Sequence, residues 1–161
     1  MKRRIEVAAH RGNVENAPEN TMPAFTDAYG IDVDMIELDL RMTKDHEIVV
    51  IHDATVDRTS DGTGMVSEMT LAELKKLDFG VKYSEKFRGT RIPTFREFLD
   101  KHGNGVHHLG FQVGDKRDAI VGELSDMGYD LRTVGYYPGS SWTIVDTEDD
   151  LGVNLNIKPK A

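Results

Sequence analysis

Three short segments carry side chains that could cleave a phosphate ester. His10-Arg11, the pair Glu37 and Asp39, and His52 each lie at the end of a short apolar run. Carboxylates two residues apart on a strand point to the same face, where they suit a hard divalent cation. Histidines can act as general acid and base, and a guanidinium binds phosphate oxygens. These residue types indicate metal-assisted phosphodiester cleavage.

Each residue also has an ordinary structural interpretation. Glu-x-Asp is common on exposed strand faces, so Glu37 and Asp39 could simply face water. His10 or His52 could be a strand-end histidine that bonds to the backbone. The functional interpretation gains from their positions, because ligand sites of parallel α/β folds gather at the carboxyl ends of strands.

The elements that must position these side chains are predicted from the apolar pattern. Residues 5–9 predict a buried strand, and residues 22–29 a helix that ends at Gly30. Residues 34–41 alternate as one strand, and residues 48–51 predict a β-branched strand that pairs back as a hairpin. Strand, helix and strand in this order open a parallel barrel or a layered α/β sheet.

The rest of the sequence predicts a change of fold class. Thr70 and Thr94 begin capping boxes, which predict helices over 71–77 and from residue 95 to near Gly103. After these the pattern is strand, helix and three strands, with Asp115 capping the helix. The earlier strands should be parallel and these later ones antiparallel, so we expect a mixed α/β chain. The later elements are expected at residues 106–113, 115–127, 130–136, 141–146 and 152–157.

Composition excludes several classes of function. The formal net charge is −8 and no basic stripe is present, which disfavours nucleic-acid binding. Cysteine is absent, so a disulfide framework is excluded and any metal must use other ligands. We expect no membrane span, since no apolar run approaches the ~20 residues required, and no export leader. These features are compatible with the cytoplasm.

Residues 5–100 resemble the N-terminal part of a glycerophosphodiester phosphodiesterase. The resemblance is carried by AHRGNVENAPENTMPAF, by IELDLRMTKDHEIVVIHDATVDRTSDGTG, and by LAELKKLDFG leading to RIPTFREFL. It implies a (β/α)8 barrel with a small helical insertion, and a small phosphodiester substrate. The resemblance makes His10 and His52 the acid–base pair and Arg11 a phosphate contact. It makes Glu37 and Asp39 ligands of Mg²⁺ or Ca²⁺.

The sequence departs from this family near its end. Where the family has a further metal-binding Glu in a motif resembling N-I-E-I-K-P, this sequence reads Asn156-Ile157-Lys158-Pro159. Lys158 would match the family's phosphate-contacting lysine. The third metal ligand and the later strands are missing, so we expect a barrel that cannot close. The chain would then be a hydrolase by lineage whose activity is weak or lost.

Residues 97–157 resemble a second family, the vicinal-oxygen-chelate superfamily of glyoxalase and methylmalonyl-CoA epimerase. The matching stretches are EFLDKHGNGVHHLGFQV and YPGSSWTIVDTEDDLGVNLNI. The resemblance implies a C-terminal βαβββ module with His108 as an alternative metal ligand. The superfamily's second ligand falls at Asn156, a poor donor. An ordinary polar-face role for His108 stays open.

The two resemblances make the chain look chimeric. We expect a truncated phosphodiesterase-barrel-like segment over 1–101 and the βαβββ module over 102–161, with a seam around 93–105. Complete chelate-type proteins pair two modules, which predicts a homodimer through an exposed strand edge. Two other functions remain open: a metal- or small-molecule-binding module, and a folded but inactive recombinant.

Overall fold

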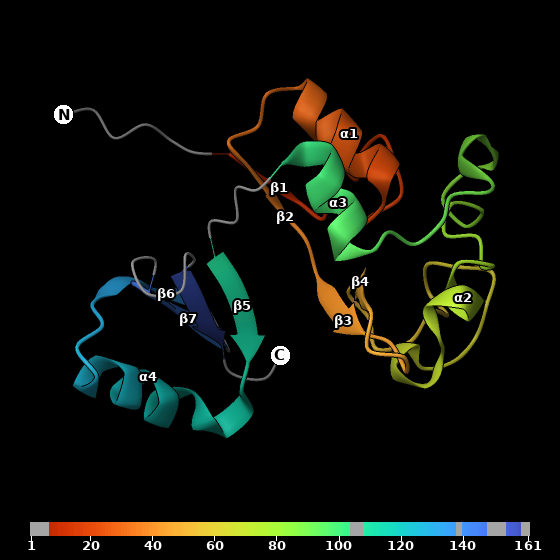
Figure 1. The fold of residues 1–161 in the computed structure, drawn as a ribbon. Coiled ribbons are helices and arrows are strands. Elements are labelled where there is room, and N and C mark those ends of the chain that lie inside the picture. The colour runs from red at the N-terminus through yellow and green to blue at the C-terminus, as the bar shows by residue number, and fades with distance from the viewer. Residues whose placement is uncertain (1–6, 104–107, 138–139, 148–153, 159–161) are drawn as a thin grey trace. The chain divides into compact units, whose positions relative to one another are not determined.

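The structure is a computed structural model that describes residues 7–103, 108–137, 140–147 and 154–158. The chain forms two compact units, Met1–Gly103 and Asn104–Ala161 (Figure 1). Each described strand pairs only within its own unit. No helix of the described residues has the length and hydropathy needed to cross a bilayer.

The first unit opens with two parallel strands joined by a helix, as the sequence predicts. β1 (Ala8–His10) pairs in parallel with β2 (Met35–Glu37), and α1 (Met22–Gly30) connects them. In this register His10 lies opposite Glu37. The strand–helix–strand arrangement therefore brings together two of the residues that the sequence singled out.

The single strand predicted over residues 34–41 is wrong. β2 ends at Glu37, and β3 (Leu40–Met42) begins after a break and pairs antiparallel with β4 (Ile48–Val50). The backbone breaks here because it leaves its parallel partner and takes up an antiparallel one. The predicted hairpin is confirmed. Asp39 lies in the break, so it does not share a strand face with Glu37.

The helices of the first unit begin where their caps predict. Both capping boxes, at Thr70 and Thr94, are present. α3 (Phe95–His102) is followed by Gly103, whose φ of 83° suits glycine. α3 lies beside α1 (Figure 1). The two helices make an edge-to-face aromatic contact, with the rings of Phe25 and Phe98 5.0 Å apart.

α2 is shorter than predicted. It spans Leu71–Leu74, whereas the sequence predicted a helix to Leu77. The chain tightens after Leu74 into turns in which Lys76 N–H donates to the Glu73 carbonyl. The Arg91 side chain then donates to the carbonyls of Lys76 and Leu77. The side chain of Arg91 thus satisfies carbonyls that have no partner within the helix.

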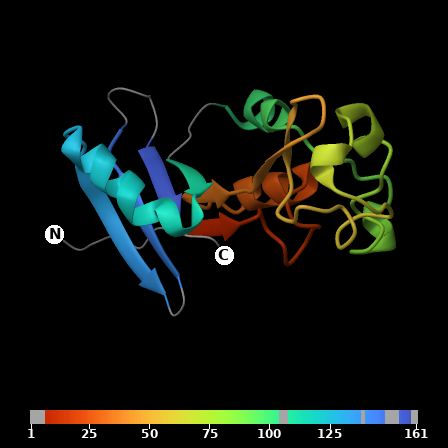
Figure 2. The same cartoon turned by 90° about the horizontal axis from the view of Figure 1, so that it is seen from below.

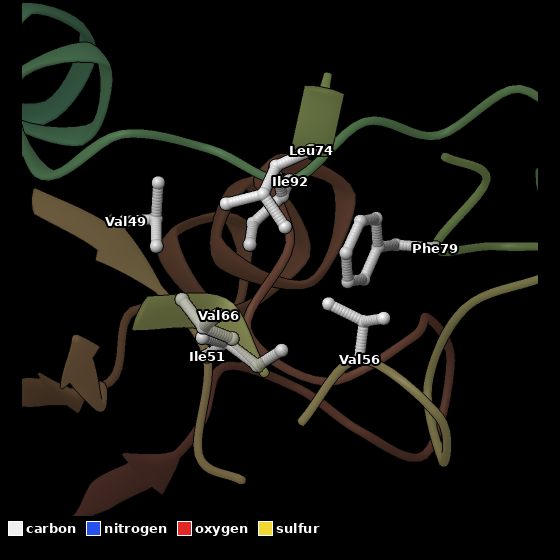
Figure 3. Packing of buried hydrophobic residues seen from close by; sticks show 7 residues of the cluster. All are labelled: Val49, Ile51, Val56, Val66, Leu74, Phe79 and Ile92. Carbon is white, nitrogen blue, oxygen red and sulfur yellow. The ribbon is translucent and has the colours of Figure 1, made fainter. Parts of the chain in front are cut away.

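A compact hydrophobic cluster organises the loop-rich insertion that follows β4. Figure 3 shows its side chains pointing toward one another. They come from β4, from α2, from the 3₁₀ helix η1 (Val66–Glu68) and from the loops between them. Each is at most 5% exposed. Burial of these side chains therefore stabilises loops that have little regular secondary structure. The members are Val49, Ile51, Val56, Val66, Leu74, Phe79 and Ile92.

The second unit is a four-stranded sheet covered on one face by a helix. Its elements follow the predicted order of strand, helix and three strands. The strand order in the sheet is β5-β8-β7-β6, and Figure 2 shows α4 lying across the sheet. The first and last strands of this unit pair in parallel, so the expectation of antiparallel strands holds only in part. The bounds are β5 (His108–Gln112), α4 (Arg117–Asp126), β6 (Leu131–Tyr137), β7 (Ser140–Val145) and β8 (Asn154–Lys158).

The start of α4 differs from the prediction. Asp115 was expected to cap the helix, but residues Gly114–Lys116 form the 3₁₀ helix η3 and Lys116 is the residue before α4. A 3₁₀ turn at a helix start satisfies some of the free amides without a side-chain cap. The predicted stop at Gly128 agrees with its φ of 97°.

Candidate active site

The carboxyl ends of β1 and β2 carry a histidine, an arginine and a carboxylate next to one another. His10 and Glu37 end their strands, and Nε2 of His10 lies 3.9 Å from Oε2 of Glu37. This distance is too long for a hydrogen bond. Arg11 leaves the strand with a φ of 61°, and its N–H donates to the Glu37 carbonyl at 2.9 Å. The backbone thereby fixes Arg11 at the end of β2.

The guanidinium of Arg11 joins the two strand ends to the turn before α1. Its Nη1 donates to Oε1 of Glu19 at 3.0 Å, and its Nε lies 3.2 Å from Oδ2 of Asp39. The Asn20 side chain donates to the same Oδ2 at 2.9 Å. Although Asp39 is not on β2, Arg11 and Asn20 bring its carboxylate into the site. The Arg11 side chain is only 18% exposed, so these contacts are well shielded from water.

His52 belongs to a second group of charged residues in the site. Its Nδ1 lies 2.7 Å from Oδ1 of Asp53. Arg58 donates to both oxygens of Asp53, at 2.7 and 3.1 Å. The same guanidinium donates to both oxygens of Glu19, at 2.7 and 2.8 Å. Glu19 therefore links the Arg58 group to the Arg11 group.

The electrostatics of this network favour ionised carboxylates. The hydrogen bonds from Arg58, followed by that from His52, hold the pKa of Asp53 well below its usual range. Arg58 likewise lowers the pKa of Glu19, by its hydrogen bond first and by its charge. The pKa of Arg58 is raised in turn, chiefly by its hydrogen bond to Glu19.

Glu37 and Asp39 fit a divalent cation in part. Within the described ranges no three His, Asp or Glu side chains form a cluster that could hold a metal ion. Oε2 of Glu37, however, is buried and has no hydrogen-bond partner in the described part of the chain. A buried carboxylate oxygen without a partner is costly, and a cation would relieve that cost. Two carboxylates suit an ion such as Mg²⁺ or Ca²⁺ that takes its other ligands from water.

Two predicted site residues lie in the second unit. Lys158 ends β8, and a Cβ placed on Gly110 would lie 3.6 Å from its Nζ. His108 begins β5, but its side chain lies outside what the structure describes. Asn156 is 4% exposed, and its Oδ1 has no hydrogen-bond partner among the described residues. Metal binding by His108 and phosphate binding by Lys158 stay predictions.

Four residues of the network were not identified as site residues from the sequence. Glu19 and Asn20 lie in the turn before α1. Asp53 directly follows His52, and Arg58 lies in a loop rich in Gly, Ser, Thr and Asp. The available signal was a lone arginine within a run of acidic and hydroxyl residues, where a cation is needed to balance charge.

Comparison with known proteins gives a consistent match. The model of the glycerophosphoryl diester phosphodiesterase family matches residues 10–133. A glycerophosphodiester phosphodiesterase of Caldanaerobacter subterraneus is 54% identical over 98 residues, which cover 61% of this chain and 40% of that protein. A glycerophosphodiester phosphodiesterase of Bacillus subtilis is 40% identical over 113 residues, which cover 65% of this chain and 39% of that protein. The chain thus spans about two fifths of the length of these relatives.

Solved structures agree with these relatives. The crystal structure of a glycerophosphodiester phosphodiesterase from Agrobacterium tumefaciens matches with a TM-score of 0.63 and 34% identity over 73% of this chain and 52% of that chain. A phosphodiesterase from Oleispira antarctica, solved with the product sn-glycerol-3-phosphate, matches with a TM-score of 0.62 and 30% identity over 75% of this chain and 51% of that chain. The mixed α/β fold expected from the sequence is confirmed. The chain belongs to the glycerophosphoryl diester phosphodiesterase family.

Proposed function

We propose that the chain carries the acid–base, phosphate-binding and metal-binding residues of a glycerophosphodiester hydrolase. One observation supports this above others: the two histidine segments are joined by a single chain of charged contacts. That chain runs from Arg11 through Glu19 and Arg58 to Asp53 and His52. Arg11 directly follows His10 in the sequence, so these contacts connect the two segments that carry the histidines.

In the proposed reaction Arg11 binds the phosphate oxygens. One of His10 and His52 removes a proton from the nucleophile, which is a water or a hydroxyl of the substrate's glycerol. The other histidine protonates the departing alkoxide, so that the P–O bond breaks without releasing a strong base. Glu37 and Asp39 would hold a divalent ion, which when bound neutralises charge on the phosphoryl group.

The proposed substrate is a small glycerophosphodiester. The Oleispira antarctica phosphodiesterase was solved with sn-glycerol-3-phosphate, a product of cleaving such a diester. We propose the same substrate class for this chain. We propose further that the first unit is the opening of a (β/α) barrel and that its two carboxylates bind Mg²⁺ or Ca²⁺ weakly. Activity would then be weak and strongly metal-dependent.

The test is hydrolysis by the full chain. Glycerophosphocholine and bis-p-nitrophenyl phosphate are each incubated with Mg²⁺ or Ca²⁺ and, separately, with a chelator. His10→Ala and His52→Ala should each lower turnover by ~10²–10⁴-fold, the usual contribution of general acid–base catalysis. His46→Asn is the matched control, because His46 is exposed in the hairpin turn and its φ of 63° suits asparagine. Hydrolysis that is absent in the unaltered chain, or unchanged in both histidine variants, would refute the proposal.

A second proposal concerns residues 102–161. The strand–helix–strand–strand–strand order of this unit supports a chelate-type module, fused to the barrel-like segment, that dimerises and binds a cation through His108. Metal titration of His108→Ala against the double variant Glu37→Ala plus Asp39→Ala assigns the ion to one unit. Sedimentation equilibrium tests the dimer, since an 18.0 kDa species at all concentrations contradicts it.

A further inference from the structure

The tautomer of His52 follows from its neighbours. Nδ1 of His52 and Oδ1 of Asp53 are 2.7 Å apart, so one of the two groups must supply the proton. Arg58 holds the pKa of Asp53 well below its usual range, which leaves that carboxylate ionised and able only to accept. Nδ1 of His52 must then carry the hydrogen. In the neutral imidazole the lone pair is therefore on Nε2.

Arg58 fixes this carboxylate with unusual completeness. A guanidinium has five N–H donors in a rigid plane and can bind two carboxylates along two of its edges. Arg58 uses Nε and Nη2 for Asp53, and Nη1 and Nη2 for Glu19. Asp53 therefore has both oxygens held by the same planar group. Rotation of its carboxylate away from His52 would break two of these bonds.

Glu19 has a second partner at the other end of the site. Its Oε1 accepts from Nη1 of Arg11 at 3.0 Å while it also accepts from Nη2 of Arg58 at 2.8 Å. The backbone of the neighbouring Asn20 donates to the Arg11 carbonyl at 3.0 Å. One carboxylate thus lies between the residue proposed to bind phosphate and the residue that holds Asp53.

We infer that Glu19 and Arg58 are positioning residues. Arg58 holds Asp53 so that His52 keeps its hydrogen on Nδ1 and exchanges protons through Nε2. Glu19 aligns Arg58 with Arg11. The catalytic part of this inference rests on the proposed function. The assignment of the tautomer does not, because it concerns the resting protein. The two can therefore fail separately.

The test is nitrogen-15 NMR of the imidazole in the full chain, at a pH where histidine is neutral. His52 is assigned by the loss of its signals in His52→Asn. We expect the Nδ1–H pattern in the unaltered chain and growth of the Nε2–H pattern in Arg58→Gln. Arg58→Lys should not restore the original pattern, since an ammonium cannot bind two carboxylates along two planar edges. Arg88→Gln is the matched control, because Arg88 also forms a two-bond pair, with Glu85.

The kinetic readout separates the two positioning residues. Arg58→Gln should lower kcat by about 10–100-fold, the usual effect of losing a group that orients a functional histidine. Glu19→Gln should lower kcat and also raise KM, because Arg11, the residue proposed to bind phosphate, loses a charged partner that holds it. Arg88→Gln should change neither kinetic constant.

Several outcomes overturn the inference. An Nε2–H pattern in the unaltered chain would do so, as would an Nδ1–H pattern retained in a folded Arg58→Gln variant. If Arg58→Gln fails to fold, Asp53→Asn replaces it and must shift the tautomer in the same direction. A shifted tautomer with no hydrolysis in the unaltered chain would refute the proposed function and leave the structural assignment intact.

Discussion

Nε of Arg11 lies 3.2 Å from Oδ2 of Asp39, two residues after β2 has ended. The contact places a guanidinium beside an oxygen that could also bind a divalent ion. Arg11 therefore has two opposing effects on the site. It holds Asp39 in place and offers donors to a phosphate, yet its charge repels a cation at the same carboxylate.

This opposition predicts that Arg11→Gln binds Mg²⁺ or Ca²⁺ more tightly than the unaltered chain while it hydrolyses substrate more slowly. The neutral amide keeps hydrogen-bonding capacity but removes the positive charge beside Asp39. Isothermal titration calorimetry measures the affinity, with Arg88→Gln as a control of equal charge change. Weaker ion binding in Arg11→Gln would contradict the prediction. It would mean that Arg11 aids ion binding by positioning Asp39 more than its positive charge opposes ion binding by repulsion.

The carboxylates themselves yield a second prediction. The unaltered chain should bind Ca²⁺ with a dissociation constant no tighter than about 10⁻⁴ M, since two carboxylates leave most of the coordination sphere to water. The double variant Glu37→Gln plus Asp39→Asn should lose this binding. Retention of the ion by the double variant would place the site elsewhere, with His108 the first residue to substitute.

Local sequence patterns predicted the elements whose causes are local. The hairpin of β3 and β4 follows from an alternating strand before a polar turn and a β-branched strand after it. The helix starts follow from the capping boxes at Thr70 and Thr94. The break before Leu40 could not be predicted this way. The alternating pattern runs unbroken through it, and only the change of strand partner, a tertiary effect, interrupts the backbone.

The residues of the candidate site also differ in whether local sequence could identify them. Sequence identified residues that follow apolar runs, such as His10 and Glu37. It did not identify Arg58, because the partner that reveals its role, Glu19, lies 39 residues away in the chain. The lone arginine among acidic and hydroxyl residues indicates that Arg58 balances charge, but the local pattern does not show which carboxylates it joins.

The lowered carboxyl pKa values predict a loss of stability in acid. The pKa values of Asp53 and Glu19 are lowered on folding, first by hydrogen bonds from Arg58. The stabilisation is therefore complete above the ordinary carboxyl pKa of about 4 and declines as the pH falls through the lowered values of the folded state. Urea unfolding between about pH 7 and pH 3 measures this. Arg58→Gln should show a shallower pH dependence than Arg96→Gln, which alters an exposed arginine of α3.

The insertion depends on its small core. Leu74 is fully buried within the cluster of Figure 3, so Leu74→Ala should lower the free energy of unfolding by about 2–5 kcal/mol. Met65→Ala is the control, since Met65 is 38% exposed and its truncation leaves little cavity. Denaturant unfolding compares the two. Equal losses would show that the cluster contributes no more than an exposed contact does.

The tightest backbone approach in the insertion gives the last prediction. A Cβ added at Gly80 would lie 1.8 Å from the carbonyl oxygen of Phe87, a contact that no side-chain rotation relieves. Separating these segments would also strain the bond from Gly80 N–H to the buried Asp78 carboxylate, which accepts from Gly89 N–H as well. We expect Gly80→Ala to lower the free energy of unfolding by about 3 kcal/mol or more.

Gly30→Ala is the matched control for this substitution. Gly30 is the last residue of α1, and nothing lies within 4 Å of an added Cβ there. Alanine favours helix over glycine, so this variant should be as stable as the unaltered chain or slightly more stable. Thermal and urea unfolding should separate the two variants widely. If Gly80→Ala instead matches Gly30→Ala, the Phe87 carbonyl can move away at little cost, and the Asp78 contacts do not hold this loop closed.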